Sequence, residues 1–206
     1  MEESLPYSQA SENNKHAILD VLRRHVADRQ SLLEIAGGTG QHAVFFAGNF
    51  PNLLWQSSDI PEVIDTLNRR LKLAKLPNLP AAIALDVDNL TWTIDTVDCI
   101  YSANSLHIMS AASVEKFFTG VARHLAADGL LMVYGPFKYD GDFTTPSNAR
   151  FDLWLKERNA ESGIRDFEWV NSLAAMIGMT LDEDNAMPAN NQLLVWRRGV
   201  ESRDFS

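Results

Sequence analysis

Short apolar runs alternate with longer amphipathic stretches along the first two thirds of the chain. The runs have the length of strands, and we predict strands at residues 31–36, 53–57, 82–85, 97–102 and 130–134. The helical spacing of apolar residues between them predicts helices at residues 14–26, 41–48, 61–75 and 113–127. Strands that alternate with helices are typical of βαβ units, so we expect an α/β fold built on a mostly parallel sheet.

Glycines mark the ends of two predicted helices. Gly129 follows the helix at residues 113–127 and suits a left-handed cap, a conformation that glycine adopts at little cost. In the last third of the chain, helical spacing predicts helices at residues 147–161 and 166–177. Gly178 suits the end of the second of these helices in the same way.

The C-terminal region contains two strand-like segments, at residues 179–182 and 193–197, joined by a linker rich in Asn, Pro and Ala. Two such segments in succession favour a hairpin. We therefore expect them to form an antiparallel pair at the edge of the sheet. The tail at residues 199–206 is predicted to be frayed.

Length and composition indicate one domain. The chain has 206 residues, of which 46% are hydrophobic, and this is enough for one core. We expect an N-terminal helical cap at residues 1–30, an insertion at residues 137–165 that could close over a substrate, and a flexible tail at residues 199–206. No apolar run approaches the roughly 18–20 residues that span a bilayer. The acidic N-terminus lacks the basic and apolar regions of a signal peptide, so we predict a cytoplasmic protein with no membrane partner.

Cysteine content and charge argue against several classes of function. The single cysteine, Cys99, allows no intrachain disulfide, and its apolar surroundings at residues 97–101 predict a small buried side chain. The formal net charge of −9 argues against binding along a phosphate backbone, which needs clustered Lys and Arg. No group of His and Cys residues has metal-ligand spacing, so no metal site is predicted.

A glycine-rich turn joins the first predicted strand to the following helix. Its sequence, over residues 34–40, is Glu-Ile-Ala-Gly-Gly-Thr-Gly. Glycines allow a ligand to approach the backbone closely, and the start of the helix presents free N–H groups to it. We predict a ligand site at Gly37, Gly38 and Gly40. The alternative is a tight turn between strand and helix that binds nothing.

Two cofactors fit this turn. Residues 38–43 match the G-x-G-x-x-G/A dinucleotide fingerprint, and Asp59 follows about 20 residues later, where a carboxylate can accept hydrogen bonds from ribose hydroxyls. Both nicotinamide and S-adenosylmethionine proteins use that arrangement. Glu34 can face a cationic amino-acid ligand, and Asp86 can accept from an adenine amino group. These two carboxylates, and a length that leaves little room for a separate substrate domain, favour S-adenosylmethionine.

Residues 34–40 resemble the first motif, Glu-x-x-x-Gly-x-Gly, of the class I S-adenosylmethionine-dependent methyltransferases. That motif usually has glycine where Ala36 stands, and the adjacent Gly37 partly offsets the difference. Further residues that fall where later motifs of that superfamily fall are Asp59, Asp86 and residues 128–131.

A closer resemblance covers nearly the whole chain. It is carried by residues 10–14, 38–43, 55–59, 104–107, 134–137, 147–148, 151–152, 163–166 and 187–191. The chain is similar to the poorly characterised family that includes methyltransferase-like protein 26, whose members are classed as methyltransferases largely by fold. The resemblance implies a Rossmann-like seven-stranded sheet with helices on both faces, a last strand that is antiparallel, S-adenosylmethionine as cofactor and S-adenosylhomocysteine as product. The cofactor-binding residues that we expect are Asn13, Glu34, Gly37, Gly38, Gly40, Asp59, Ile60, Asp86, Val87 and Asn104.

The resemblance places the acceptor site beyond the fourth strand, at residues 104–107. His107 is the candidate base because an imidazole titrates near neutral pH, and Asn104 is the second candidate catalytic residue. The alternative is a histidine that only hydrogen-bonds a loop. The Asn-Pro-Pro-Tyr sequence of many amino-group nucleic-acid methyltransferases is absent, so nucleic-acid substrates are not expected. Polar residues predicted on the substrate side are Asn148, Arg150, Asp152, Arg165, Asn190 and Asn191.

Three functions stay open at this point. The leading hypothesis is an S-adenosylmethionine-dependent methyltransferase that acts on a small molecule or a protein side chain. The second is a nicotinamide-dependent oxidoreductase that uses the same turn. The third is a non-catalytic module that keeps the methyltransferase fold to bind a partner. A comparison of adenosylhomocysteine binding with NAD binding distinguishes the first two functions. A measurement of turnover distinguishes the non-catalytic module from both enzymes.

Overall fold

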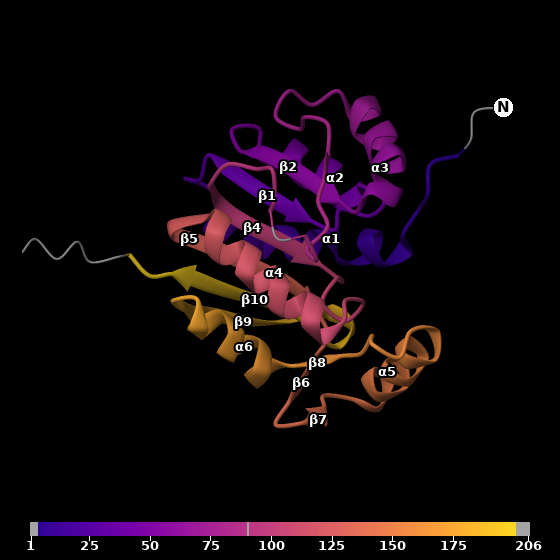
Figure 1. The fold of residues 1–206 in the computed structure, drawn as a ribbon. Coiled ribbons are helices and arrows are strands. Elements are labelled where there is room, and N and C mark those ends of the chain that lie inside the picture. The colour runs from indigo at the N-terminus through magenta and orange to yellow at the C-terminus, as the bar shows by residue number, and fades with distance from the viewer. Residues whose placement is uncertain (1–3, 90, 201–206) are drawn as a thin grey trace, which may run out of the picture.

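A seven-stranded sheet forms the centre of the computed structural model, which describes residues 4–89 and 91–200 (Figure 1). Its strands, in spatial order, are β3 (Ile83–Ala84), β2 (Leu54–Asp59), β1 (Ser31–Ile35), β4 (Val97–Ala103), β5 (Leu125–Gly135), β10 (Asn191–Arg198) and β9 (Met179–Met187). Neighbours from β3 to β5 are parallel, whereas β10 runs antiparallel to both β5 and β9. The predicted α/β class, strand number and C-terminal antiparallel hairpin are confirmed.

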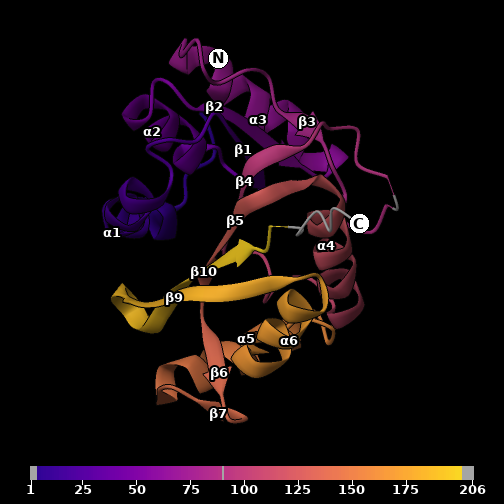
Figure 2. The same ribbon diagram turned by 90° about the vertical axis from the view of Figure 1, so that its left-hand side faces the viewer.

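Helices cover both faces of this sheet, as predicted (Figure 2). One face packs against α1 (Gln9–His25), α2 (Gln41–Asn49) and α3 (Pro61–Ala74) through a core that includes Phe46, Trp55 and Tyr101. The other face packs against α4 (Ala111–His124) and α6 (Phe167–Met176) through a core that includes Phe117 and Trp196. Burying this apolar surface on both faces is the main favourable contribution to folding.

The segment predicted as an insertion forms a small layer of its own. It consists of β6 (Phe137–Tyr139), β7 (Asp142–Phe143), α5 (Pro146–Arg158) and β8 (Arg165–Asp166), and the three strands pair in the order β7-β6-β8. Figure 1 shows this layer next to α6, away from α2 and α3. None of its strands was predicted, because strands of two or three residues leave no periodic pattern in the sequence.

Helix α1 begins earlier than the apolar pattern predicted. Predicted to start at residue 14, it starts at Gln9, because the Ser8 hydroxyl accepts a hydrogen bond from the Ser11 N–H as an N-cap. The added turn is polar and therefore carries no apolar periodicity. The helix is also more than a cap, since Ile18 and Leu22 are completely buried in the core.

The prediction for Gly129 was wrong. Helix α4 ends at His124 rather than at residue 127, and the chain enters β5 directly at Leu125. The left-handed residue here is Asp128, with φ of 60°. The pairing register between β4 and β5 shifts near Val97, which accommodates residues 126–129 as an irregularity at the start of the strand.

The other boundaries differ from the predictions by a few residues. Helix α5 ends at Arg158 rather than at residue 161, and the hairpin strands β9 and β10 are longer than predicted, with only residues 188–190 between them. Side chains of β9 alternate between exposed and partly buried along its polar half, which is the pattern of an edge strand. Gly178, with φ of +76°, has the predicted left-handed conformation.

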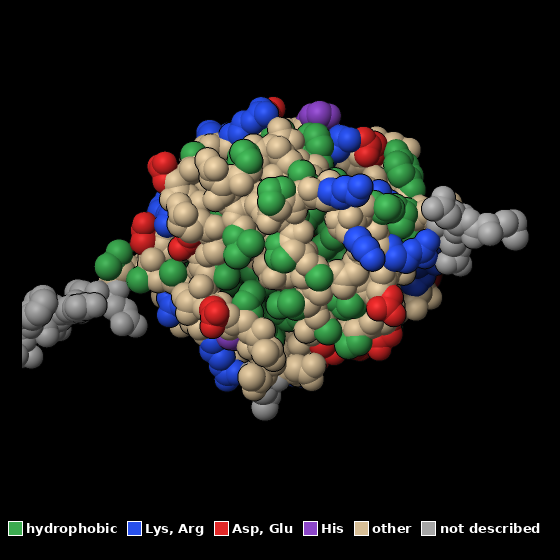
Figure 3. All heavy atoms as spheres, turned by 90° about the horizontal axis from the view of Figure 1, so that it is seen from above, with side chains coloured by type: hydrophobic (Ala, Val, Ile, Leu, Met, Phe, Trp, Pro, Cys, Tyr) green, Lys and Arg blue, Asp and Glu red, His purple; other side chains and the backbone are tan. Residues whose placement is uncertain are grey.

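Several predictions concern the ends and the surface of the chain. In the predicted tail, the Gly199 N–H donates to the Gly178 carbonyl at 2.9 Å and Val200 is exposed, while residues 201–206 lie outside the described residues. Among the residues described, no helix has the length and apolar character required to cross a bilayer. Seen from above Figure 1, the charged side chains lie mainly around the rim of the molecule, and hydrophobic side chains and backbone fill most of the centre of this face (Figure 3). Cys99 is buried, and burial raises the pKa of its thiol to about 12.

Candidate functional site

The glycine loop, residues 36–40, leaves the end of β1 and enters α2. Its glycines serve different purposes. A β-carbon at Gly37 would lie 2.3 Å from the Ser57 hydroxyl oxygen, so this position has no room for a side chain. Gly38 and Gly40 have positive φ, +55° and +74°, which favours glycine. Apart from Gly38 itself and its two chain neighbours, no residue comes within 4 Å of a β-carbon built at Gly38, so the loop faces open space there.

Ala36 also has a left-handed backbone, with φ of 60°. It stands where the methyltransferase motif usually has glycine, and its conformation explains that preference. An L-residue in this region costs roughly 1–2 kcal/mol because its β-carbon crowds the following carbonyl. The loop therefore keeps the geometry of the motif at some cost in strain.

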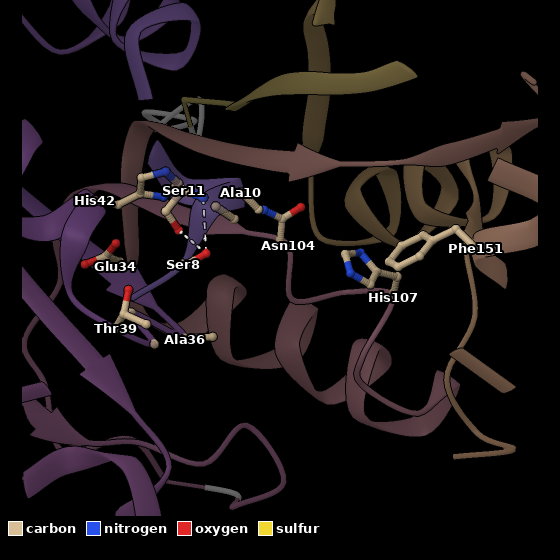
Figure 4. Close-up of a pocket in the computed structure, with 13 residues that line it drawn as sticks. Ser8, Ala10, Ser11, Glu34, Ala36, Thr39, His42, Asn104, His107 and Phe151 are labelled. Atoms are coloured by element: carbon tan, nitrogen blue, oxygen red, sulfur yellow. Dashed lines mark hydrogen bonds between the residues drawn. The ribbon is translucent and has the colours of Figure 1, made fainter. Parts of the chain in front are cut away.

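Two cavities flank the loop, and Ala36 lines both of them. The larger has a volume of about 360 Å³, and Figure 4 shows Glu34 and Thr39 at one side of it and His107 and Phe151 at the other. The smaller has a volume of about 190 Å³ and lies at the ends of β2 and β3. Both lie at the carboxyl ends of the parallel strands, where open α/β sheets bind ligands.

Asp59 ties the glycine loop to β2. One carboxylate oxygen accepts from the Gly38 N–H at 2.7 Å and the other from the Ile60 N–H at 2.8 Å. Partial burial raises the pKa of this carboxyl, and the two backbone donors oppose the shift. The predicted residues Asp59, Ile60, Asp86 and Val87 all line the smaller cavity, so the fold brings these four together.

Glu34 lies beneath the loop with its side chain almost fully buried. One of its oxygens accepts from the Ser57 hydroxyl at 2.7 Å and from the Trp55 indole N–H at 3.0 Å. Burial is the largest influence and raises the pKa of Glu34 to about 7, although both hydrogen bonds favour the ionised form. The residue lines the larger cavity, so its charge near neutral pH responds to what enters there.

Asn13 lies apart from the other predicted cofactor residues. Its side chain is exposed on α1 and accepts from the Gln9 amide at 2.8 Å, and it does not line either cavity. The next residue, Asn14, points inward and lies 2.7 Å from the Nε2 atom of His42. One step along a helix rotates a side chain by about 100°, which separates these two environments.

Asn104 and His107 both line the larger cavity, as the acceptor-site prediction requires. Asn104 is left-handed, with φ of 55°, and its N–H donates to the Tyr134 carbonyl at 2.8 Å. His107 is 6% exposed and packs edge-on against the Phe151 ring at 5.4 Å. Burial, and secondarily the charge of Arg165, lower the pKa of His107 to about 4, so the imidazole is neutral at pH 7.

The six residues predicted on the substrate side do not line the larger cavity. Asn148 donates to the Thr144 hydroxyl and the Asn190 carbonyl, at 2.9 and 3.0 Å. The Asn190 and Asn191 side chains bond within the same corner, to Ser147 and to the 188–189 carbonyls. Together these contacts tie α5 to the tip of the β9–β10 hairpin.

Asp152 and Arg165 are likewise engaged with the protein. The Asp152 carboxylate accepts from the Ile164 N–H and pairs with Lys156, each at 2.7 Å. Arg165 donates to three backbone carbonyls, so its guanidinium is not available for a substrate carboxylate in this conformation. Arg150 is exposed on α5 and lines neither cavity.

Some residues that line the larger cavity were not among the predicted site residues. They come from the start of α1, from α2 and from α5, and they are Ser8, Ala10, Ser11, His42 and Phe151. Ser8 is held there because its backbone N–H and carbonyl both bond the Gln41 side-chain amide. The N-capping pattern at Ser8 could have extended α1 in the prediction, but nothing local indicates that the helix start meets the glycine loop.

Residues 5–198 match the model of a family described as a protein of unknown function, DUF938. The chain belongs to this family. The match covers every residue discussed above as part of the site. Membership in this family does not assign an activity to the chain, because the family description names none.

Solved structures with a similar fold include methyltransferases. An O-methyltransferase family protein from Burkholderia thailandensis has a TM-score of 0.80 at 16% identity, covering 91% of this chain and 57% of that one. Human N-acetylserotonin methyltransferase in complex with SAM has a TM-score of 0.79 at 14% identity, and the match covers 93% of this chain and 53% of that one. An O-methyltransferase family 2 protein from Planctomyces limnophilus in complex with apigenin has a TM-score of 0.76 at 19% identity, and the match covers 92% of this chain and 58% of that one.

This DUF938 chain therefore has the fold of the class I S-adenosylmethionine-dependent methyltransferases, as its sequence indicated. It spans a little over half of the length of each of these three proteins. The position of the reversed strand agrees with the fold. An all-parallel dinucleotide-binding sheet has the order 3-2-1-4-5-6, whereas here β10 enters antiparallel between β5 and β9.

Proposed function

We propose that this DUF938 protein is an S-adenosylmethionine-dependent methyltransferase whose acceptor is a neutral hydroxyl of a small molecule. The observation that carries the proposal is that one cavity is lined both by the glycine loop and by a buried neutral histidine, His107. A cofactor site alone would also suit a binding module. A proton acceptor in the same cavity suits a reaction.

The two cavities fit the two halves of the cofactor. Glu34 and the open face of Gly38 would hold the cationic amino-acid end in the larger cavity. Asp59, Asp86 and neighbouring apolar residues would hold the ribose and adenine in the smaller cavity, with Ala36 between the two. S-adenosylmethionine supplies a methyl group on a sulfonium sulfur, which becomes the neutral sulfur of S-adenosylhomocysteine when the acceptor oxygen takes the methyl carbon.

His107 would take the proton that the acceptor hydroxyl releases. Because the pKa of His107 is lowered to about 4, its ring nitrogens are free of an extra proton at neutral pH and can accept a hydrogen bond. A weak base of this kind acts late, when methyl transfer has already acidified the hydroxyl. Asn104, from the end of β4, would orient the acceptor beside it.

The lining of the cavity favours an uncharged acceptor. Its ionisable side chains are Glu34, His42 and His107, and burial lowers the pKa of His42 to about 4 as well, so both histidines are neutral at pH 7. No Lys or Arg lines this cavity in the part of the chain that the structure describes. A carboxylate or phosphate on the acceptor would therefore lose its hydration without gaining a partner. Phe151 offers a flat apolar surface instead.

Cofactor binding is the first test. A ligand at a hundredfold excess over its Kd stabilises the folded state by about 2.7 kcal/mol, or roughly 5–10 °C in Tm for a domain of this size. We expect adenosylhomocysteine to raise the Tm by this amount and NAD to leave it unchanged. A shift with NAD alone would overturn the proposal in favour of the oxidoreductase.

Turnover is the second test. The protein is incubated with labelled S-adenosylmethionine and two matched sets of small hydroxyl compounds, one neutral and one bearing a carboxylate or phosphate. We expect label to enter members of the neutral set, and label confined to the charged set would refute the acceptor class. Cofactor binding with no label transferred to any small molecule or protein would favour a non-catalytic module.

A further inference from the structure

The His107 loop, residues 105–110, follows β4 and carries the proposed base. Its own hydrogen bonds are few. The N–H groups of Ile108 and Met109 both donate to the Ser105 carbonyl, at 2.9 and 3.1 Å, and form a single turn. A turn this short does not fix its own orientation, because one or two local bonds barely offset the conformational entropy of the residues they order.

A second segment holds this turn from outside. The Gly163 N–H donates to the His107 carbonyl at 2.9 Å, and the Ser162 hydroxyl donates to the Ile108 carbonyl at 2.8 Å. Arg165 donates through Nε to the Leu106 carbonyl at 3.2 Å and through Nη2 to the Met109 carbonyl. The four consecutive carbonyls of residues 106–109 thus all accept from residues 162–165.

The holding segment is itself fixed to α5. The Arg165 Nη2 atom also donates to the Glu161 carbonyl at 2.7 Å, which closes the segment on itself. The Ile164 N–H donates to Asp152, a carboxylate that is 3% exposed and pairs with Lys156 on the same helix. Two polar residues predicted to meet the substrate, Asp152 and Arg165, therefore belong to this support.

We propose that residues 161–165 form a clamp that positions His107, with Arg165 as its principal positioning residue. The clamp holds the backbone on both sides of His107, so the imidazole stays in the cavity against Phe151. The catalytic meaning of the clamp rests on the proposed function, but its effect on His107 can be measured in the protein alone.

The clamp also sets the electrostatic surroundings of the imidazole. The charged group that faces His107 is the Arg165 guanidinium, which opposes protonation of the ring. Burial lowers the pKa of Arg165, while the charges of Asp152 on α5 and of Glu161 act in the opposite direction and favour the charged guanidinium. Loss of Arg165 removes a positive neighbour and exposes the loop to water. Both changes favour the protonated imidazole, so both raise the pKa of His107.

The test is an NMR titration of the five histidines in the unliganded protein. The His107 signal is assigned by its loss in His107→Gln. In Arg165→Met we expect the pKa of His107 to rise by at least one unit, and hydrogen exchange of the amides at residues 105–110 to accelerate at least tenfold at pH 7. The pKa of His42, at the other side of the cavity, serves as the internal reference and is expected to stay unchanged.

A matched control is Arg198→Met. Arg198 also bonds two backbone carbonyls, those of Ala122 and Leu125, but it lies on β10 away from the cavity. We expect this variant to lower Tm without changing the titration of His107. Arg165→Lys keeps the charge but cannot bridge two carbonyls as a guanidinium does, so it is expected to restore the pKa only in part and the slow amide exchange hardly at all.

Ser162→Ala is the milder variant if Arg165→Met does not fold. It removes one hydroxyl bond to the Ile108 carbonyl and is expected to accelerate exchange of the same amides by a smaller factor. Unchanged His107 titration and unchanged amide exchange in a folded Arg165→Met protein would overturn the clamp. Neither measurement involves a cofactor or acceptor, so the failure of methyl transfer and the failure of the clamp give different results.

Discussion

The glycine loop and the His107 loop line the same cavity, but different parts of the chain hold them. Within the glycine loop, the Gly37 and Gly38 N–H groups bond Ser58 and Asp59, at 2.9 and 2.7 Å, and these partners lie on the next strand of the same βαβ unit. The His107 loop is held by residues 161–165, more than fifty positions away along the chain. The first arrangement is a local motif, whereas the second forms only when residues 161–165 fold against the loop that follows β4.

The largest effect is expected at the acceptor side of this comparison. His107→Ala should lower methyl transfer by roughly 10²–10⁴-fold, the usual range for a general base, with the Kd of adenosylhomocysteine nearly unchanged. His107→Gln should be equally slow, because an amide cannot take the proton. Turnover and isothermal titration on the same preparations measure both quantities. His16→Ala, an exposed site on α1, is the control. Turnover near the wild-type level would remove His107 from the reaction.

A smaller effect is expected at the glycine loop, where a substitution should weaken cofactor binding. Asp59→Ala removes a carboxylate that fixes the Gly38 and Ile60 N–H groups and faces the smaller cavity. Hydrogen bonds to charged groups contribute roughly 1.5–3 kcal/mol, so the affinity for adenosylhomocysteine should fall at least tenfold. Asp65→Ala, at an exposed carboxylate on α3, should bind normally. Equal affinities of the two folded variants would contradict the role of Asp59.

The pH dependence of binding sharpens the comparison further. Glu34 has its pKa raised to about 7, so its carboxyl is mostly protonated at pH 6 and mostly ionised at pH 8. The ionised form attracts the cationic amine of the ligand, so affinity for adenosylhomocysteine should increase with rising pH, by up to about tenfold between these values. Glu34→Gln should lose this increase, because glutamine does not titrate. Titration of the ligand amine affects both proteins equally, so it cannot cause a difference between them. If the affinities of the wild-type protein and of Glu34→Gln change with pH in the same way, Glu34 is not the group that attracts the ligand amine.

The smallest effect concerns strain in the loop. Ala36→Gly relieves a left-handed alanine but adds freedom to the unfolded chain, which leaves a net stabilisation of about 0.5–1 kcal/mol. Ala112→Gly, on the exposed face of α4, should change stability by a similar amount in the opposite direction. Urea unfolding of the two variants provides the comparison. A destabilised Ala36→Gly protein would show that Ala36 makes contacts that outweigh its backbone strain.

The sequence by itself determined the parts of the protein that depend on neighbours in the chain. Short apolar runs identified every strand of the main sheet, and the glycine-rich turn predicted the loop at residues 36–40 because backbone sterics there act within a few residues. Asp59 and Asp86 were predicted at strand ends, where a carboxylate can accept from ribose hydroxyls or an adenine amino group, and Ile60 and Val87 were expected beside them from the resemblance; all four line the smaller cavity. His107 was predicted because the resemblance places the acceptor site after the fourth strand, and it lines the larger cavity.

The tertiary structure decided which side chains face the cavity and which only support it. A shift of one residue along α1 turned Asn13 outward and Asn14 inward, and apolar periodicity does not resolve two adjacent polar residues. Asp152 and Arg165 have the chemistry of substrate-binding residues, but Arg165 bonds carbonyls of the His107 loop and Asp152 holds the segment that carries it. Backbone carbonyls that find no partner within their own loop need donors from elsewhere, and only the tertiary fold brings residues 162–165 to them.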